Sequence, residues 1–369
     1  MRAVILVGGE GTRLRPLTFD TPKPLIPVAN RPFLEHVLAR LSRHGVTEAI
    51  LTTGYLAEAF EAFPDALTHG VKLTIVREER PLGTCGAVRN VAELLDDTFF
   101  VLNGDILTDV DLSEMLRVHR ERNAVGTLAL SRVRDPSAYG LVPIDGEGRI
   151  EQFIEKPRAD ESLKTDLINA GTYILEPDAL AGVPAGETWS FERQLFPGLL
   201  SDGAPLFGFP SQAYWLDLGT PQKYLRANVD VLEGKVGEPP PGERSAAGVW
   251  TDTGADIDPT VRLRGPAAIG PDCRVAEGAV IYPLTCIGPD CEIGAGAVIE
   301  ESVLHEGVVV DPKAVVERSV LAGGVYIGAG SRVADAIIGP GVRVGAENEL
   351  RSGIRLWPGL EIPDGSIRF

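Results

Sequence analysis

Aliphatic residues recur every six positions in the last third of the chain, and this period restricts the fold more than any other feature. The first run is Ile257, Leu263, Ile269, Val275, Ile281, Ile287, Ile293 and Ile299. The step resumes at Val309, Val315, Leu321, Ile327 and Val333, and again at Ile338, Val344, Leu350 and Leu356. A coil with three six-residue sides turns one such side chain per side inward, whereas a sandwich of sheets would alternate every two residues. The period therefore predicts a left-handed parallel β-helix of hexapeptide repeats over residues 249–369.

Residues 1–232 show a different pattern, in which short apolar strands alternate with amphipathic helices. We expect strands at residues 3–7, 49–53, 72–76, 98–102 and 127–133, and a helix over residues 33–44. Two further strands, 141–144 and 149–154, flank the turn 145–148 as a hairpin. The alternation predicts an α/β domain with a Rossmann-like, mixed and mostly parallel sheet. The segment 233–248 is rich in Pro, Gly and charge, and we expect a linker there.

Composition restricts the partners and the compartment. The net charge of −17 leaves no broad basic surface for nucleic acid or an anionic membrane. No apolar run approaches membrane-spanning length and the N-terminus lacks a signal-peptide pattern, so we expect a cytoplasmic protein. The four cysteines, Cys85, Cys273, Cys286 and Cys291, form no C-x-x-C pair, which favours reduced thiols over a zinc site.

Glycines cluster where the first predicted strand ends, in the run Leu6-Val7-Gly8-Gly9-Glu10-Gly11-Thr12-Arg13. Glycine lets backbone N–H groups approach phosphate oxygens without a Cβ in the way. Arg13 could then contact phosphate with two donors, and Lys23 of the following Pro-Lys-Pro adds a point charge. The run fits neither the dinucleotide-binding fingerprint nor the P-loop. Taken alone, it is equally typical of a tight turn with solvated arginines.

Two aspartates end segments that lie far apart in the sequence. Asp105 closes the run that begins at Phe99, and Asp217 precedes Gly219-Thr220-Pro221. Open α/β sheets bind ligands at the carboxyl ends of their strands, where carboxylate oxygens can hold Mg²⁺ beside nucleotide phosphates. A turn aspartate and a residue ahead of a helix cap at Thr220 are the structural alternatives. The pair predicts a Mg²⁺ site on condition that the fold brings both residues together.

The motifs of the chain, and the order in which they occur, resemble those of the nucleotide-sugar pyrophosphorylase family. Its glycine-rich signature with P-K-P is matched by residues 8–27, L-G-T-x-G by 82–86, F-x-E-K-P by 153–157, N-A-G by 169–171 and W-x-D-x-G-T-P by 215–221. The resemblance implies nucleotide contacts from Leu6, Gly8, Gly9, Gly11, Thr12, Arg13, Lys23, Gly83, Thr84 and Asp105. It implies sugar-phosphate contacts from Tyr139, Gly140, Glu155, Lys156 and Asn169. It assigns catalysis to Arg13, Lys23 and Lys156, and Mg²⁺ to Asp105 and Asp217. Cys85 stands where the family has Ala or Gly, which favours a tolerated small residue over a reactive thiol.

Within the family, residues 11–25, 81–86 and the tail 356–365 most resemble the two-domain mannose-1-phosphate guanylyltransferases. That resemblance implies in-line attack of mannose 1-phosphate on the α-phosphorus of GTP, giving GDP-mannose and pyrophosphate. The alternatives are a thymidylyl- or uridylyltransferase acting on glucose 1-phosphate, and a non-catalytic subunit that senses nucleotide sugars. Acetyl transfer on the β-helix is a further alternative. It is disfavoured because His305 is the single histidine beyond residue 248 and has no companion motif. We expect the β-helix to support a homo-oligomer, a dimer or tetramer, since exposed coil ends must be capped or paired.

Overall fold

A computed structural model describes residues 1–133, 135–155 and 165–368 of the chain. The chain divides into two compact units, and each unit is made of two stretches that are separated in the sequence. The first unit comprises Met1–Gly9 and Val37–Asp217, and the second comprises Glu10–His36 and Leu218–Phe369. The glycine-rich signature is therefore split between the units. The expected boundaries at residues 232 and 248 stay a prediction.

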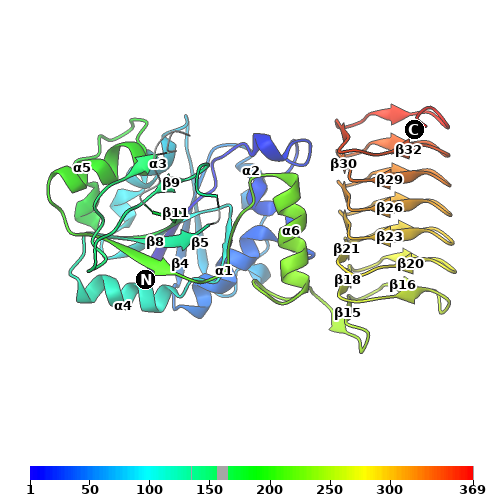
Figure 1. The fold of residues 1–369 in the computed structure, drawn as a ribbon, viewed down its shortest axis with the longest axis horizontal. Helices are drawn as coiled ribbons and strands as arrows, with labels where there is room; N and C mark the ends of the chain where they lie inside the picture. The colour runs from blue at the N-terminus through cyan, green and yellow to red at the C-terminus, as the bar shows by residue number, and fades with distance from the viewer. Residues whose placement is uncertain (134, 156–164, 369) are drawn as a thin grey trace. The chain divides into compact units, whose positions relative to one another are not determined.

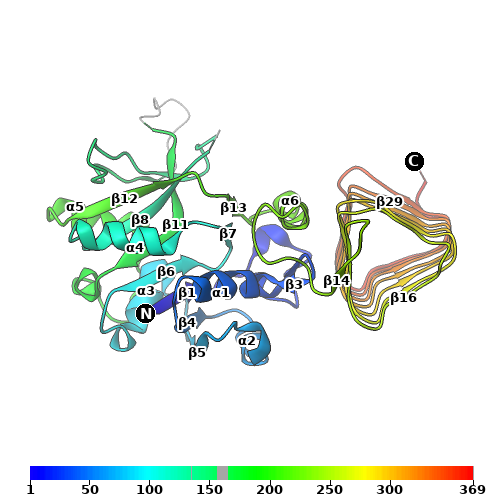
Figure 2. The same cartoon turned by 90° about the horizontal axis from the view of Figure 1, so that it is seen from below.

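The first unit is built on a nine-stranded mixed sheet, most of whose strands are labelled in Figure 2. β1 lies between β4 and β6 and is parallel to both, and β5 extends the parallel part beyond β4. β11 is antiparallel to β6 and to β8. The strands are β1 (Arg2–Leu6), β4 (Glu48–Thr53), β5 (Lys72–Arg77), β6 (Phe99–Asn103), β8 (Gly126–Arg132), β9 (Gly140–Leu141), β10 (Ile154–Glu155), β11 (Leu167–Leu175) and β12 (Leu206–Ser211). The predicted Rossmann-like sheet is confirmed.

The predicted hairpin around residue 145 is much shorter than expected. β9 and β10 pair through two residues each, and Ile144 and Ile150 form one isolated bridge. The Asp145 carboxylate accepts hydrogen bonds from the N–H groups of Glu147 and Arg149, which forms the turn. Beyond the turn, the N–H of Ile150 donates to Leu206 O of β12. Within the hairpin, Asp145 N donates to Arg149 O at 2.9 Å and Glu151 N donates to Pro143 O at 3.0 Å, so the ladder bonds there flank the single pair of Ile144 and Ile150.

Helices connect the strands, and a side chain caps the start of α4 (Leu112–Glu121) and of α6 (Pro221–Leu232). Asp111 accepts a hydrogen bond from Glu114 N at the start of α4, and Thr220 accepts one from Lys223 N at the start of α6. α3 packs on β1, whereas α4 packs on β8, β11 and β12. The helices are α1 (Phe33–Arg43), α2 (Glu58–Glu61), α3 (Gly83–Asn90), α4 (Leu112–Glu121), α5 (Phe196–Ser201) and α6 (Pro221–Leu232). Tyr173, Phe191 and Phe196 are fully buried and pack ring against ring in the core of this unit.

The second unit contains a left-handed parallel β-helix, as predicted. Its coils stack along one axis in Figure 1 and give a triangular outline in Figure 2. The three sides form sheets of eight, seven and six strands. The first sheet is β14 (Glu243–Arg244), β15 (Val249–Thr251), β18 (Ala267–Ile269), β21 (Thr285–Ile287), β24 (Val303–Leu304), β27 (Val320–Leu321), β30 (Ile337–Ile338) and β33 (Arg355–Leu356). The second is β16 (Asp256–Ile257), β19 (Arg274–Val275), β22 (Glu292–Ile293), β25 (Val309–Val310), β28 (Tyr326–Ile327), β31 (Arg343–Val344) and β34 (Glu361–Ile362). The third is β17 (Arg262–Leu263), β20 (Val280–Ile281), β23 (Val298–Glu300), β26 (Val315–Glu317), β29 (Arg332–Ala334) and β32 (Glu349–Leu350).

The expected register is wrong in the middle coils. Val310 and Val316 are buried inside the coil, whereas the predicted Val309 and Val315 are only half-buried. The reason is a shortened corner: Ile269 pairs with Ile287, 18 residues on, but Ile299 pairs with Val316, 17 residues on. Glu301, which occupies this corner, has a φ of +45°. The neighbouring Ser302 accepts a hydrogen bond from Ser319 N of the next coil.

Candidate functional site

The glycine-rich signature begins at the carboxyl edge of the central strand of the first unit. β1 pairs with β6 through Leu6 and Asn103, so Gly8 and Gly9 leave the sheet beside the end of β6. Both glycines are exposed, and a Cβ on Gly9 would meet nothing within 4 Å. The N–H of Gly104 donates to Leu6 O at 2.9 Å. Open space thus lies beside Gly9, whereas Gly104 packs closely on β1, since a Cβ there would lie 2.7 Å from Leu6 O.

The two predicted metal ligands are brought together by a short strand pair. β7 (Ile106–Thr108) and β13 (Trp215–Asp217) lie side by side in Figure 2 and are antiparallel, with Asp217 opposite Ile106. Asp105 immediately precedes Ile106, so the pairing places both carboxylates at the same end of this ribbon. Asp217 is 8% exposed and Asp105 is half-buried. Two carboxylates at the carboxyl edge of a parallel sheet suit a hard divalent cation.

Aromatic side chains orient Asp217. The hydroxyl of Tyr139 donates to Oδ2 of Asp217 at 3.2 Å. The Tyr139 ring meets Trp215 edge to face, with centroids 5.3 Å apart. Trp215 Nε1 in turn donates to Ala170 O at 3.0 Å. A residue predicted to contact sugar phosphate is therefore joined directly to a predicted metal ligand.

The remaining residues predicted to contact the sugar phosphate are Gly140, Glu155, Lys156 and Asn169. Gly140 begins β9 and pairs with Glu155 of β10. Asn169 Oδ1 accepts a hydrogen bond from Gly171 N, and its Nδ2 donates to the Tyr173 hydroxyl at 2.8 Å. The structure describes Glu155 by its backbone, and Lys156 lies outside the described residues.

The start of α3 is held against residues 187–189. Cys85 N and Gly86 N both donate to Trp189 O, at 2.9 and 3.1 Å. Gly83 has a φ of +70°, which favours glycine, and a Cβ there would lie 2.8 Å from Trp189 O. Thr84 Oγ1 accepts a hydrogen bond from Phe191 N at 3.1 Å. Cys85 is buried, and burial raises the pKa of its thiol to about 12, which favours the tolerated small residue over a reactive thiol.

Two glutamates at this end of the sheet were not found from the sequence. Glu78 Oε2 accepts a hydrogen bond from Leu82 N at 3.0 Å, and burial raises the pKa of its carboxyl. Glu192 accepts hydrogen bonds from Thr84 at 3.5 Å and from Tyr173 at 3.4 Å. The signal for Glu78 was its position directly after β5, at the same kind of strand end as Asp105. Glu192 carried no such signal.

The other signature residues belong to the second unit. Thr12–Leu14 form one 3₁₀ turn, and both Thr12 and Arg13 are exposed. Gly11 has a φ of +63°, and a Cβ there would lie 3.3 Å from the Cβ of Lys23. The fold therefore brings Gly11 and Lys23 together although 12 positions separate them in the sequence.

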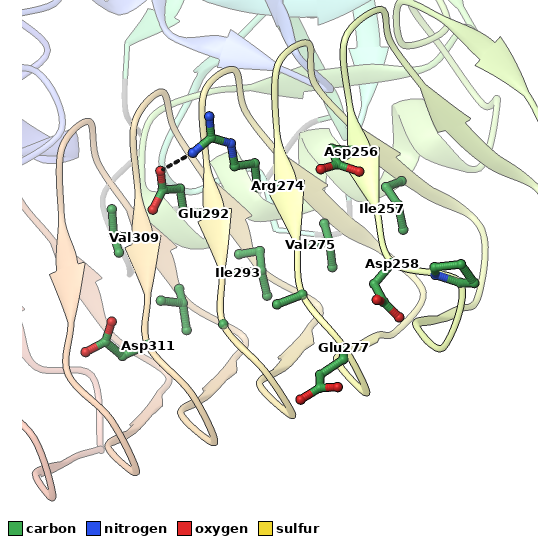
Figure 3. Close-up of a pocket in the computed structure, with 14 residues that line it drawn as sticks. Asp256, Ile257, Asp258, Arg274, Val275, Glu277, Glu292, Ile293, Val309 and Asp311 are labelled. Atoms are coloured by element: carbon green, nitrogen blue, oxygen red, sulfur yellow. Dashed lines mark ion pairs between the residues drawn. The ribbon is translucent and has the colours of Figure 1, made fainter.

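The β-helix carries a hollow on its second sheet, shown in Figure 3. Its acidic side chains come from successive coils and include Asp256, Asp258, Glu277 and Asp311. Arg274 and Glu292 form the ion pair drawn there, with 3.6 Å between N and O. In the described part of the chain, no three or more His, Cys, Asp or Glu side chains cluster in a way that could hold a metal ion. Nor is any helix in that part of sufficient length and apolarity to cross a membrane.

Comparison with known families gives two matches along the chain. Residues 2–234 match the family described as Nucleotidyl transferase, and residues 263–359 match the family described as GMPPB C-terminal domain. The first match spans more than half of the chain. The second lies wholly within the β-helix.

Individual relatives extend these matches. The mannose-1-phosphate guanylyltransferase of Mycobacterium tuberculosis is 45% identical over 371 residues, which cover 100% of this chain and 97% of that protein. The UTP–glucose-1-phosphate uridylyltransferase of Synechocystis sp. is 35% identical over 316 residues, which cover 76% of this chain and 81% of that protein. The crystal structure of HddC from Yersinia pseudotuberculosis complexed with GMP-PN is similar with a TM-score of 0.54 and 30% identity. It covers 62% of this chain and 97% of that one.

Proposed function

The chain belongs to the nucleotidyl transferase family, and from that premise we propose that it transfers GMP from GTP to mannose 1-phosphate. The products are GDP-mannose and pyrophosphate. The structural observation that carries the proposal is the edge where β1 and β6 end together. Gly8 and Gly9 follow β1, Asp105 follows β6, and Asp217 is paired opposite Ile106. The choice of base and sugar is supported by the full-length similarity to a mannose-1-phosphate guanylyltransferase.

In the proposed reaction a phosphate oxygen of the sugar phosphate attacks the α-phosphorus of the triphosphate. A new P–O bond forms as the bond to the β-phosphate oxygen breaks, and pyrophosphate leaves with the electron pair. The attacking oxygen is already anionic at neutral pH, so no general base is required. Catalysis then consists of positioning two anions and neutralising their charge.

We assign these tasks to residues of the signature and of the sugar-phosphate motifs. The N–H groups of the glycine-rich segment would cradle the triphosphate, and Arg13 would stabilise the departing pyrophosphate. Lys23 and Lys156 would reduce the repulsion between the two anionic substrates. Tyr139, Gly140, Glu155 and Asn169 would contact the sugar phosphate, while Gly83 and Thr84 at the start of α3 would contact the nucleotide.

Asp105 and Asp217 would hold Mg²⁺. The fit rests on the β7–β13 pairing, which brings two carboxylates to the same end of one ribbon. When bound, the ion supplies positive charge beside the reacting phosphates. The chain's own contribution is to orient the ligands, and the hydrogen bond from Tyr139 to Asp217 does this at one of them.

A second candidate is uridylyl transfer to glucose 1-phosphate. It is favoured by the similarity to the Synechocystis protein, whose name gives that activity. The same sheet edge would serve both reactions, because the difference lies in the groups that contact the base and the sugar hydroxyls.

A pyrophosphate-release assay tests the proposal. We would combine GTP, UTP, dTTP and ATP with mannose, glucose and galactose 1-phosphates, in Mg²⁺ and after chelation. The proposal expects the highest kcat/KM for GTP with mannose 1-phosphate and no turnover without metal. Preference for UTP with glucose 1-phosphate would favour the second candidate. Binding of GDP-mannose without turnover of any pair would instead indicate a sensing subunit.

A further inference from the structure

The segment that continues the glycine-rich signature packs on the β-helix within one compact unit. Arg355 Nη1, on β33, donates to the carbonyl oxygen of Arg15 at 3.2 Å. Trp357 meets the ring of Phe19 edge to face, with centroids 5.3 Å apart. A Cβ on Gly339 would lie 3.0 Å from the Cβ of Pro16, so the backbone of an adjacent coil also approaches the segment closely. The last coils therefore hold residues 15–19.

The same segment is fixed a second time at its other end. Asn30 Nδ2 donates to Ile287 O at 2.8 Å. The hydroxyl of Tyr224 on α6 contacts Pro27 O and lies 2.9 Å from Nε2 of His305. Ile287 and His305 lie on or directly after strands of the same sheet that contains β33. One side of the β-helix thus supports both ends of residues 15–30.

Residues 11–18 are hydrogen-bonded among themselves, so a support at Arg15 also restrains Arg13. Leu14 N donates to Gly11 O at 2.9 Å, and Leu17 N donates to Leu14 O at 3.1 Å. Thr18 Oγ1 closes the loop by donating to the same Gly11 oxygen at 2.9 Å. Arg13 is two residues from the carbonyl that Arg355 binds. Movement at Arg15 would therefore displace the turn that carries Arg13.

Side chains connect the tail to the glycine-rich segment as well. From Trp357 the contacts pass to Phe19, over whose ring the Arg15 guanidinium lies at 5.1 Å. Arg15 Nη2 then pairs with Glu10 at 3.1 Å. Trp357 is 48% exposed, which is unusual for so large an apolar side chain. Its contact with Phe19 gives this exposed ring a specific role.

We propose that Arg355 and Trp357 are positioning residues for the nucleotide-binding loop. By holding residues 15–19, they keep Gly11, Thr12 and Arg13 in the conformation that receives the triphosphate. The inference rests on the proposed function and deepens it, because it makes the last coil of the β-helix a determinant of triphosphate binding. The role is indirect, since neither side chain needs to touch the nucleotide.

The full-length protein is used for the test, with Arg355→Ala and Trp357→Ala as variants. Arg274→Ala is the matched control for the first, since Arg274 also begins a two-residue strand but lies on the second sheet. Leu360→Ala is the control for the second, because Leu360 is 44% exposed in the same region. We expect KM for the triphosphate to rise about tenfold in the two variants, with a smaller change in kcat. KM for the sugar phosphate and the melting temperature should change no more than in the controls.

Conservative variants separate positioning from general stability. Trp357→Phe keeps an aromatic ring against Phe19 and should restore most of the wild-type KM, as should Arg355→Lys, which keeps a donor. A wild-type KM in both alanine variants would overturn the proposal. So would an equal rise in the Arg274 or Leu360 control.

The outcome can be distinguished from failure of the proposed function. If the wild type turns over no substrate pair, binding of GTP in the presence of Mg²⁺ would be measured by calorimetry instead. Weaker binding by the two variants than by their controls would then uphold the positioning role while the proposed reaction fails. Equal affinities, or no triphosphate binding by the wild type, would overturn the positioning role too.

Discussion

The hydroxyl of Tyr139 donates a hydrogen bond of 3.2 Å to Oδ2 of Asp217. Tyr139 lies just before β9 and Asp217 ends β13, so the contact joins two elements that are 78 positions apart. Trp215 packs against the Tyr139 ring and donates a hydrogen bond to Ala170 O. These two contacts restrict the position of the tyrosine ring. The carboxylate thus has one oxygen oriented by a phenol, as is typical of metal ligands whose geometry is set by their neighbours.

Replacing Asp217 by Asn should reduce turnover on the order of 10²–10³-fold. Asn keeps the size of the side chain and an acceptor for Tyr139 but removes the negative charge that the proposed Mg²⁺ requires. The measurement is kcat for pyrophosphate release over a range of Mg²⁺ concentrations. Asp109→Asn is the control, since Asp109 is an exposed residue directly after β7. Unchanged kcat and metal dependence in Asp217→Asn would remove Asp217 from the site.

The Tyr139→Phe variant tests the orienting hydrogen bond separately. We expect the Mg²⁺ concentration for half-maximal activity to rise roughly tenfold, because losing such a partner typically weakens a metal ligand by 10–100-fold. In an Asp217→Asn background the same change should have much less effect, since both act through one carboxylate. Equal effects in the two backgrounds would show that Tyr139 acts independently of Asp217.

A methyl group at Gly86 should destabilise the start of α3. Its Cβ would lie 2.5 Å from Glu187 O and 3.2 Å from Trp189 N, so backbone must move. Such overpacking costs about 1–3 kcal/mol, and Gly86→Ala should lower the urea midpoint. Gly198→Ala is the matched helical control, because nothing lies within 4 Å of a Cβ at Gly198 in α5. That variant should be neutral or stabilising, by up to about 1 kcal/mol. Equal midpoints for the two variants would contradict the close approach of residues 187–189.

His305 should make the stability of the protein depend on pH. Burial lowers the pKa of His305 to about 4. The residue keeps some accessible surface, but its Nε2 lies 2.9 Å from the hydroxyl of Tyr224, a side chain that is 1% exposed. The unfolded chain, with a histidine pKa of about 6.5, takes up the proton first. The stabilisation is therefore full above about pH 6.5 and is lost as the pH falls toward 4.

The measurement is the urea midpoint between pH 7.5 and 4 for the wild type and for His305→Gln, which cannot titrate. As the pH falls, the wild type should lose more stability than His305→Gln does. His44 and His119 also have pKa values lowered by burial, so comparison with the variant is needed to isolate His305. The exposed His69→Asn, in the first unit, is the control that shows whether replacing any histidine changes the slope. A slope in His305→Gln equal to that of the wild type would contradict the expectation.

The sequence predicted the two kinds of architecture because each has its own hydrophobic period. It could not predict that Asp217 lies opposite Ile106, since the register of two short strands depends on tertiary packing. It also gave no sign that Glu10–His36 would belong to the same compact unit as the β-helix, although they directly follow β1 in the sequence. That arrangement depends on contacts such as Asn30 with Ile287, 257 positions apart. The six-residue step failed where Val309-Val310 and Val315-Val316 present two valines, either of which fits the pattern.

This ambiguity gives a direct test of the observed register. Val316 is fully buried between Ile299 and Val333 in its sheet, whereas the adjacent Val315 is half-buried. Val316→Ala removes two methyl-sized groups from the coil interior and should cost about 2 kcal/mol, seen as a lower urea midpoint. Val315→Ala is the matched control and should cost much less, because less apolar surface leaves a buried environment. The reverse order of the two midpoints would restore the predicted register, in which Val309 and Val315 point inward.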